Sequence, residues 1–181
     1  MLWRVATKKG WLAKQAQEGK QKLLVRQINN PIANTDFTLL AFQGMGLEKR
    51  AKFGIAGCAR DPLAKEGVCV IKQGEQGCYL TNIEYCEKAV KALSYGSFAL
   101  ANTNILFADL KALSEASYTN PLPGKILNFR TDTNGNQKVA RLETMMQNIS
   151  EQFTFSLEEP SPIFLSCTPR LKTISCTKKL P

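Results

Sequence analysis

Apolar positions in the N-terminal part of the chain, residues 1–30, recur at helical spacing. The residues on this predicted apolar face are Val5, Leu12, Ala16 and Leu23. Gly10 and Gly19 weaken the helical pattern, and Pro31 ends it because proline lacks a backbone N–H and restricts the residue before it. The pattern predicts one long, weakly amphipathic helix over residues 2–29.

The middle of the chain, residues 34–80, has no sustained period. Seven glycines interrupt the apolar runs in this stretch, which leaves short strands such as 68–72 between loops. Thr81 begins a capping box, in which its hydroxyl caps a helix and Glu84 bonds back to the threonine backbone. We therefore expect a loop-rich region followed by a helix over residues 82–93.

From Gly124 onward the pattern changes to a period of two, which is typical of strands. The predicted strands are 125–131, 137–144, 153–158, 163–167 and 171–176. Asn134-Gly135 lies between the first two and favours a tight hairpin turn. The elements predict an α+β fold with a long N-terminal helix over residues 1–30. A single globular domain over 31–181 is expected to end in an antiparallel sheet.

Six cysteines and no histidine distinguish the composition. No Cys-x-x-Cys pair occurs, and zinc would lack its usual nitrogen ligand, so disulfides are favoured over a metal or redox site. Buried free thiols are the alternative. The sequence cannot choose among the possible pairings, and the simplest is that of neighbours: Cys58 with Cys69, Cys78 with Cys86, and Cys167 with Cys176. Such bonds would staple the loop-rich middle of the chain and tie down its C-terminal end.

The net charge of +9 is concentrated near the N-terminus. Residues 1–30 carry seven basic side chains and one acidic side chain, Glu18, which gives +6 against +3 for the rest of the chain. Trp3 and Trp11 lie among these cations, a composition suited to phosphate or anionic-lipid contacts. The candidate residues for an anionic surface are Arg4, Lys8, Lys9, Lys14, Lys20, Lys22 and Arg26.

No apolar run reaches the roughly 18 residues that a transmembrane helix requires. Charged residues also occupy the positions where a signal peptide would be apolar, among them Arg4, Lys8 and Lys9. Disulfides form in oxidising compartments, so a disulfide-bonded protein has to be exported. We therefore expect an export signal upstream of residue 1 and a location in the periplasm or at the cell surface.

The order of the elements resembles that of type IV pilins and type II secretion pseudopilins. Those proteins combine a protruding N-terminal helix, a cysteine-bearing loop region and a C-terminal antiparallel sheet that a cysteine pair closes. Cys167 and Cys176 hold the place of that pair here. The resemblance implies a non-enzymatic assembly or adhesion subunit, whose N-terminal helix packs against other subunits. The alternative is a basic protein that binds nucleic acid or an anionic membrane surface through that helix.

Residues 132–143 partly match a calcium-binding loop. The candidate ligands, at the first, third, fifth and twelfth positions of that loop, are Asp132, Asn134, Asn136 and Glu143. Gln137 stands where the loop needs a glycine for its sharp turn, and the flanking segments have the pattern of strands. A plain β-hairpin is therefore favoured over a calcium site, and no other cofactor is expected.

No motif supports catalysis. Without histidine, a cysteine or serine nucleophile lacks its usual base. The segment Pro123-Gly124-Lys125 lacks both the upstream glycine and the following Ser/Thr of a phosphate-binding loop. An extracytoplasmic enzyme would need a catalytic set that the sequence does not show. We therefore expect that the protein is not an enzyme.

Overall fold

The computed structural model describes residues 2–28, 30, 37–61, 64, 66–84, 99–131 and 138–173. The strands of its main sheet are β1 (Lys22–Val25), β2 (Phe53–Ala59), β3 (Val68–Gly74), β4 (Gly77–Ile83), β5 (Leu100–Asp109) and β8 (Ile163–Thr168). A second, two-stranded sheet consists of β6 (Lys125–Thr131) and β7 (Lys138–Thr144). The helices are α1 (Leu2–Lys8), α2 (Trp11–Gln17), α3 (Phe37–Glu48), α5 (Leu110–Thr119), α6 (Arg170–Thr173) and the 3-10 helix η2 (Met146–Gln152).

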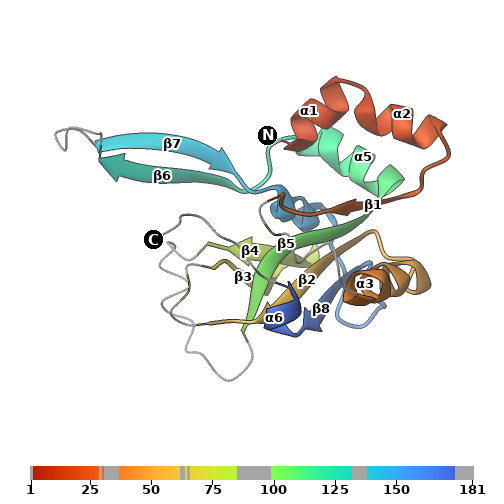
Figure 1. The fold of residues 1–181 in the computed structure, drawn as a ribbon. Helices are drawn as coiled ribbons and strands as arrows, with labels where there is room; N and C mark the ends of the chain where they lie inside the picture. The colour runs from red at the N-terminus through yellow and green to blue at the C-terminus, as the bar shows by residue number, and fades with distance from the viewer. Residues whose placement is uncertain are drawn as a thin grey trace.

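Strand β5 lies at the centre of the main sheet, whose order is β4-β3-β5-β2-β8 with β1 also beside β5. The strands β1, β2 and β3 all pair with β5 in antiparallel fashion, whereas β8 is parallel to β2. Side chains of a strand alternate between its two faces. Leu106 and Ala108 therefore enter the core formed with α1, α2, α5 and η2, while Ile105 and Phe107 enter the core with Phe42 of α3. Helices α1, α2 and α5 lie on one side of the sheet and α3 lies on the other (Figure 1).

The predicted long N-terminal helix is wrong. Gly10 and Gly19 adopt φ values of +68° and +79°, in the left-handed region, and the chain between residues 2 and 25 forms α1, α2 and β1 instead. Trp3 and Leu12 are buried in the core with β5, so this segment folds back onto the sheet. Of the helices in the described residues, none is both long and apolar enough to cross a membrane. A domain boundary at residue 30 stays a prediction.

The predicted C-terminal antiparallel sheet is also wrong. The strands expected at 125–131 and 137–144 are confirmed as the antiparallel pair β6 and β7, but this hairpin extends away from the main sheet (Figure 1). The strand expected at 163–167 is confirmed as β8, which joins the main sheet parallel to β2. Residues 153–158 contribute one isolated bridge, and a helix, α6, occupies the start of the strand expected at 171–176.

The predicted disulfides are wrong, because each predicted pair contains a free thiol. The free cysteines are Cys58, Cys69, Cys78 and Cys167. Cys86 and Cys176 lie outside the described residues. Burial raises the pKa of Cys58 to about 11 and that of Cys69 to about 12, so both side chains are neutral, apolar parts of the core. Free thiols do not require an oxidising compartment, and an extracytoplasmic location stays an untested prediction.

The close approach of Phe164 to β2 requires glycine at residue 54, because a Cβ atom there would overlap the Phe164 ring. We expect Gly54→Ala to lower the free energy of unfolding by about 1–3 kcal/mol, measured by urea denaturation. Gly44→Ala in α3 is the matched control, since its Cβ would meet no atom within 4 Å and alanine favours a helix over glycine. Equal stability of the two variants would contradict this packing.

Asp109 joins the start of α5 to β1. Its Oδ1 accepts a hydrogen bond from the Ala112 N–H (2.9 Å), and its Oδ2 accepts one from the Lys22 ammonium (2.7 Å). Burial opposes ionisation of this carboxyl, but the two bonds together outweigh it and hold the pKa of Asp109 below its ordinary value. The resulting stabilisation is present above the unfolded pKa of about 4 and is lost as the pH falls through the lowered folded pKa.

We expect Asp109→Asn to destabilise the fold by about 1 kcal/mol near pH 7, because the charge-assisted bonds to the carboxylate are lost. The loss should shrink as the pH falls through the lowered pKa of Asp109, because the wild-type carboxyl then becomes neutral as well. Thermal unfolding of both proteins across this pH range measures the difference. Glu75→Gln, in the exposed turn between β3 and β4, is the control. A loss independent of pH would show that the carboxylate charge contributes nothing.

Candidate functional site

A β-bulge interrupts the pairing of β2 with β5. The single step from Ala56 to Gly57 on β2 corresponds to three steps on β5, which leaves Thr103 and Asn104 as extra residues. Asn104 adopts a φ of +57°, in the left-handed region that asparagine tolerates better than most residues. Bulges redirect side chains and are frequent beside active sites. This bulge therefore marks a candidate site.

Thr103 and Asn102 hold the bulge in place. The Thr103 hydroxyl donates to the Ala56 carbonyl (2.6 Å) and accepts from the Ile105 N–H (3.3 Å). The Asn102 side chain accepts from the Asn104 N–H through Oδ1 and donates through Nδ2 to Asn104 Oδ1, both at 2.9 Å. The Asn104 amide is thereby fixed in one orientation, with its own Nδ2 group left for other contacts.

Asn104 lines a pocket of about 320 Å³, which we call the polar pocket. Its lining residues are Leu2, Gln27, Glu84, Asn104, Thr144, Met145, Met146 and Gln147. Among these, Glu84 is the one ionisable side chain, and the polar atoms of the others are amides and a hydroxyl. The Trp3 indole N–H donates to the Met146 carbonyl (2.7 Å), which attaches this wall to α1. The groups suit a small, neutral, hydroxyl-rich ligand.

A buried polar network supports the pocket from the side of β4. The Asn148 amide donates to Thr81 Oγ1 (2.9 Å), to Glu151 Oε1 (2.9 Å) and to the Asn82 carbonyl (3.2 Å). The Asn82 amide in turn donates to Glu84 Oε1 (3.0 Å), so the network reaches the pocket carboxylate. Thr81 lies in β4, where its hydroxyl donates to Glu151, and the predicted helix cap at Thr81 is wrong.

The predicted basic residues do not gather at the polar pocket. Lys9 and Arg26 line an apolar groove beside it, Lys22 binds Asp109, and Lys20 lies 3.2 Å from Glu18. The remaining three are exposed on α1 and α2: Arg4, Lys8 and Lys14. No finding tests whether these side chains contact an anion.

The predicted calcium ligands Asp132, Asn134 and Asn136 lie outside the described residues. Glu143 lies in β7, where the Arg141 guanidinium binds its carboxylate. In the part of the chain that the structure describes, no three His, Cys, Asp or Glu side chains converge to hold a metal ion. The calcium loop stays a prediction.

A protein-family model described as UTP–glucose-1-phosphate uridylyltransferase matches residues 2–159. In Arabidopsis thaliana, the curated protein UTP–glucose-1-phosphate uridylyltransferase 3, chloroplastic, is 32% identical over 99% of this chain. The chain belongs to the UTP–glucose-1-phosphate uridylyltransferase family. It spans 24% of the length of that relative.

Solved structures share the fold of this uridylyltransferase-family chain. A mutant UDP-glucose pyrophosphorylase from Leishmania major has a TM-score of 0.69 and 23% identity over 96% of this chain and 38% of its own. A protein described as UDP-glucose phosphorylase from Trypanosoma brucei has a TM-score of 0.70 and 20% identity over 94% of this chain and 36% of its own. At these identities the likeness establishes the fold alone.

The family overturns the expected function. The resemblance to pilins and pseudopilins is wrong, and so is the expectation of a non-enzymatic assembly or adhesion subunit with other subunits as partners, because the matched family is one of enzymes. Nucleic-acid binding through a long N-terminal helix is wrong as well, since that helix does not form. Asn102 and Asn104 are not among the site residues predicted from the sequence. The available signal was the polar run Asn-Thr-Asn inside an otherwise apolar strand.

We expect Thr103→Val to destabilise the fold by about 1–3 kcal/mol, although the two side chains have nearly the same shape. The change removes the buried hydroxyl, and with it the hydrogen bonds to the Ala56 carbonyl and from the Ile105 N–H. Urea denaturation measures the loss, with Thr119→Val at the exposed end of α5 as the control. Unchanged stability of Thr103→Val would mean that the bulge does not depend on this hydroxyl.

Proposed function

We propose that this chain supplies the sugar-binding part of a UTP–glucose-1-phosphate uridylyltransferase, and that the polar pocket binds the glucosyl group. The observation that carries the proposal is the bulge that presents Asn104 to a pocket containing Glu84. The family description names UTP and glucose 1-phosphate as the substrate pair, which gives the hydroxyl-rich ligand a chemical identity.

The lining of the pocket matches the chemistry of a hexose. Each sugar hydroxyl both donates and accepts a hydrogen bond, so the Glu84 carboxylate accepts from hydroxyls while the amides of Asn104 and Gln147 bond in either direction. Met145 and Met146 offer apolar surface to the C–H groups of the ring. The volume of about 320 Å³ lies at the lower end of the range for small-molecule sites.

Charge sets the direction in which the ligand lies. No cationic side chain lines the polar pocket among the residues that the structure describes, and Glu84 repels phosphate. The phosphate groups of a bound sugar nucleotide therefore point out of the pocket. The glucosyl group is held inside, where hydrogen bonds to Asn104 on β5, to Gln147 on η2 and to Glu84 just after β4 fix its orientation.

Uridylyl transfer joins a phosphate oxygen of glucose 1-phosphate to the α-phosphorus of UTP and breaks the bond to pyrophosphate, which leaves. In this proposal the described residues bind and orient the glucosyl group, so that its phosphate can be placed in line with the bond that breaks. The transfer itself is proposed for the whole protein, of whose curated relative this chain matches 24%.

The test is a titration of the chain with UDP-glucose, followed by isothermal calorimetry and by saturation transfer to the sugar protons. Glu84→Gln and Asn104→Gly should each weaken binding at least tenfold, because a hydrogen-bonding group to the sugar is lost or loses its charge. Glycine is chosen at residue 104 because it accepts the positive φ without strain. Glu75→Gln, on an exposed turn, is the matched control with unchanged binding.

Two results would contradict the proposal. One is a folded wild-type chain that does not bind UDP-glucose. The other is binding that Glu84→Gln and Asn104→Gly leave as it is. Amide NMR spectra of each variant establish that the fold is retained, so that a loss of binding is not a loss of structure.

A further inference from the structure

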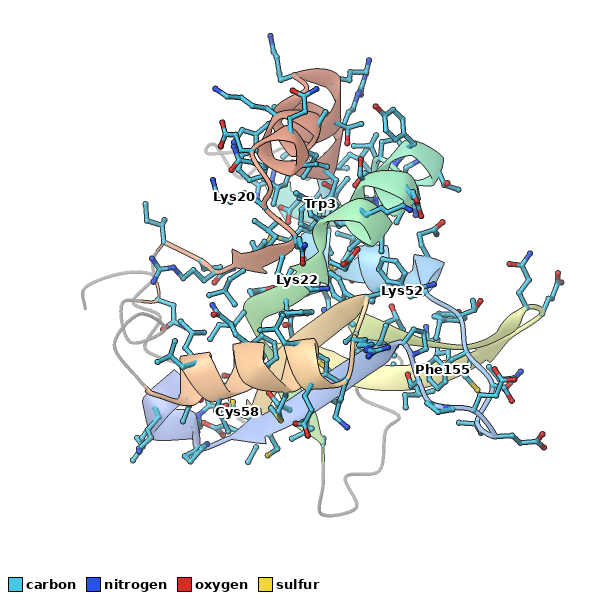
Figure 2. The ribbon with its side chains drawn as sticks, turned by 90° about the vertical axis from the view of Figure 1, so that its right-hand side faces the viewer. Trp3, Lys20, Lys22, Lys52, Cys58 and Phe155 are labelled. Carbon is cyan, nitrogen blue, oxygen red and sulfur yellow. The ribbon has the colours of Figure 1, made fainter. Side chains whose placement is uncertain are left out.

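The β6–β7 hairpin leaves the body of the protein without a covering element. It extends away from the main sheet in Figure 1, and no other helix or strand of the described chain packs along it. Figure 2 views the molecule from the opposite end, with the helices and the main sheet toward the viewer and the hairpin behind them. A two-stranded ribbon alone is marginally stable in water. The hairpin is therefore stabilised by whatever covers one of its faces.

One face of the hairpin is apolar. Side chains alternate between the two faces along each strand, and the register places Leu127 opposite Leu142. Phe129 lies opposite Ala140 on the same face, nearer the tip. The three large side chains are 55% (Leu127), 68% (Phe129) and 62% (Leu142) exposed, and Ala140 is exposed as well. We call these four residues the apolar face of the hairpin, because adjoining exposed apolar side chains mark an interaction surface.

The opposite face of the hairpin has no such patch among its described side chains. Its Arg141 guanidinium binds the Glu143 carboxylate on the same strand. The apolar members of this face, Ile126 and Val139, lie near its two ends, with the level of Arg141 between them. The apolar face is therefore the side of the hairpin on which a partner would dock.

The apolar face is complementary to itself. Three of its side chains are large and one is small, so Ala140 leaves a notch beside Phe129. A twofold axis across the strands lays one hairpin antiparallel on a second copy, with the Phe129 pair of each over the Leu127 pair of the other. Leu142 of each copy then fills the notch at Ala140 of the other. The two bodies lie at opposite ends of this contact and do not collide, because each hairpin extends away from its own body.

Charge does not oppose the contact. The four residues of the apolar face are uncharged, and residues 125–144 contain four basic and two acidic side chains, a net charge of +2. Lys125 ends the apolar face at the base of the hairpin, and the antiparallel arrangement places the two Lys125 side chains at opposite ends. Exposed charges more than roughly 8 Å apart are largely screened at physiological ionic strength.

We propose that two copies of this chain associate through the apolar faces of their hairpins and form a four-stranded, two-layered contact. Sheets that pack face to face lie about 10 Å apart, a distance that leucine and phenylalanine side chains fill. Burial of four side chains from each copy removes on the order of 800 Å² in total from water, less than the roughly 1,200 Å² of stable interfaces. The dimer is therefore reversible, with a Kd of about 1 µM or weaker. The inference does not depend on what the polar pocket binds.

The test is sedimentation equilibrium of the 181-residue chain between about 10 µM and about 1 mM. The mean mass should rise with concentration from that of one chain toward that of two. Leu127→Lys and Phe129→Lys should each raise the Kd of the dimer at least tenfold, because each puts a charge into the apolar contact. Val139→Lys is the matched control, since Val139 is 46% exposed on the opposite face of the same hairpin, and it should leave the Kd unchanged.

A pair of substitutions tests the fit at the notch. Ala140→Phe fills the notch and should raise the Kd at least tenfold, because Leu142 of the second copy loses its place. The double variant Ala140→Phe/Leu142→Ala moves the notch to residue 142 and should restore most of the affinity. Amide NMR spectra of dilute samples establish that each variant is folded as a monomer.

Three results would overturn the proposal. One is a wild-type chain that stays monomeric over the whole concentration range. Another is a dimer that Leu127→Lys and Phe129→Lys leave intact, or that Val139→Lys weakens equally, since its contact would then lie elsewhere. The third is a double variant that associates no better than Ala140→Phe alone, which would contradict the antiparallel fit of the two hairpins.

Discussion

Strand β5 has to satisfy three neighbouring strands and two hydrophobic cores at once, and the rest of the structure depends on that constraint. Because the side chains of β5 alternate between the two faces of the sheet, a slip by one residue would exchange them. Phe107 would enter the core that now holds Leu106, and Leu106 would enter the core that now holds Phe107. The bulge takes up two extra residues without such a slip. Residues 105–108 keep their register with β2, and Asn104 lines the polar pocket. The position of Asn104 at the pocket thus follows from the strand register that both cores require.

The polar network between β4 and η2 gives the pocket its rigidity. Apolar side chains in this place would need no hydrogen-bond partners, whereas each buried amide or hydroxyl does. The network instead connects Asn148, Asn82 and Glu84 in series, so the position of the pocket carboxylate is set by buried groups on two elements. A carboxylate held in this way loses little rotational freedom when it binds a ligand, which favours affinity for hydroxyl groups.

The sequence alone predicted the strands of the hairpin. A period of two over the short segments 125–131 and 137–144 is typical of strands and not of helices. It failed for residues 2–29, because helical spacing does not reveal which apolar residues a distant element will bury. Cysteine content could not separate buried thiols from disulfides, since both favour the interior. Glu84 was singled out, but as part of a helix cap. Asn104 carried no motif, because its position arises only when β5 pairs with β2.

The N-terminal segment contributes directly to the wall of the polar pocket. Trp3 is 2% exposed, and its indole N–H holds the Met146 carbonyl, which belongs to the pocket wall. Leu2, the residue before Trp3, lines both the polar pocket and the apolar groove beside it. Movement of α1 away from the sheet would break the bond to Met146 and open the pocket on that side. The packing of α1 and the shape of the pocket therefore cannot vary independently.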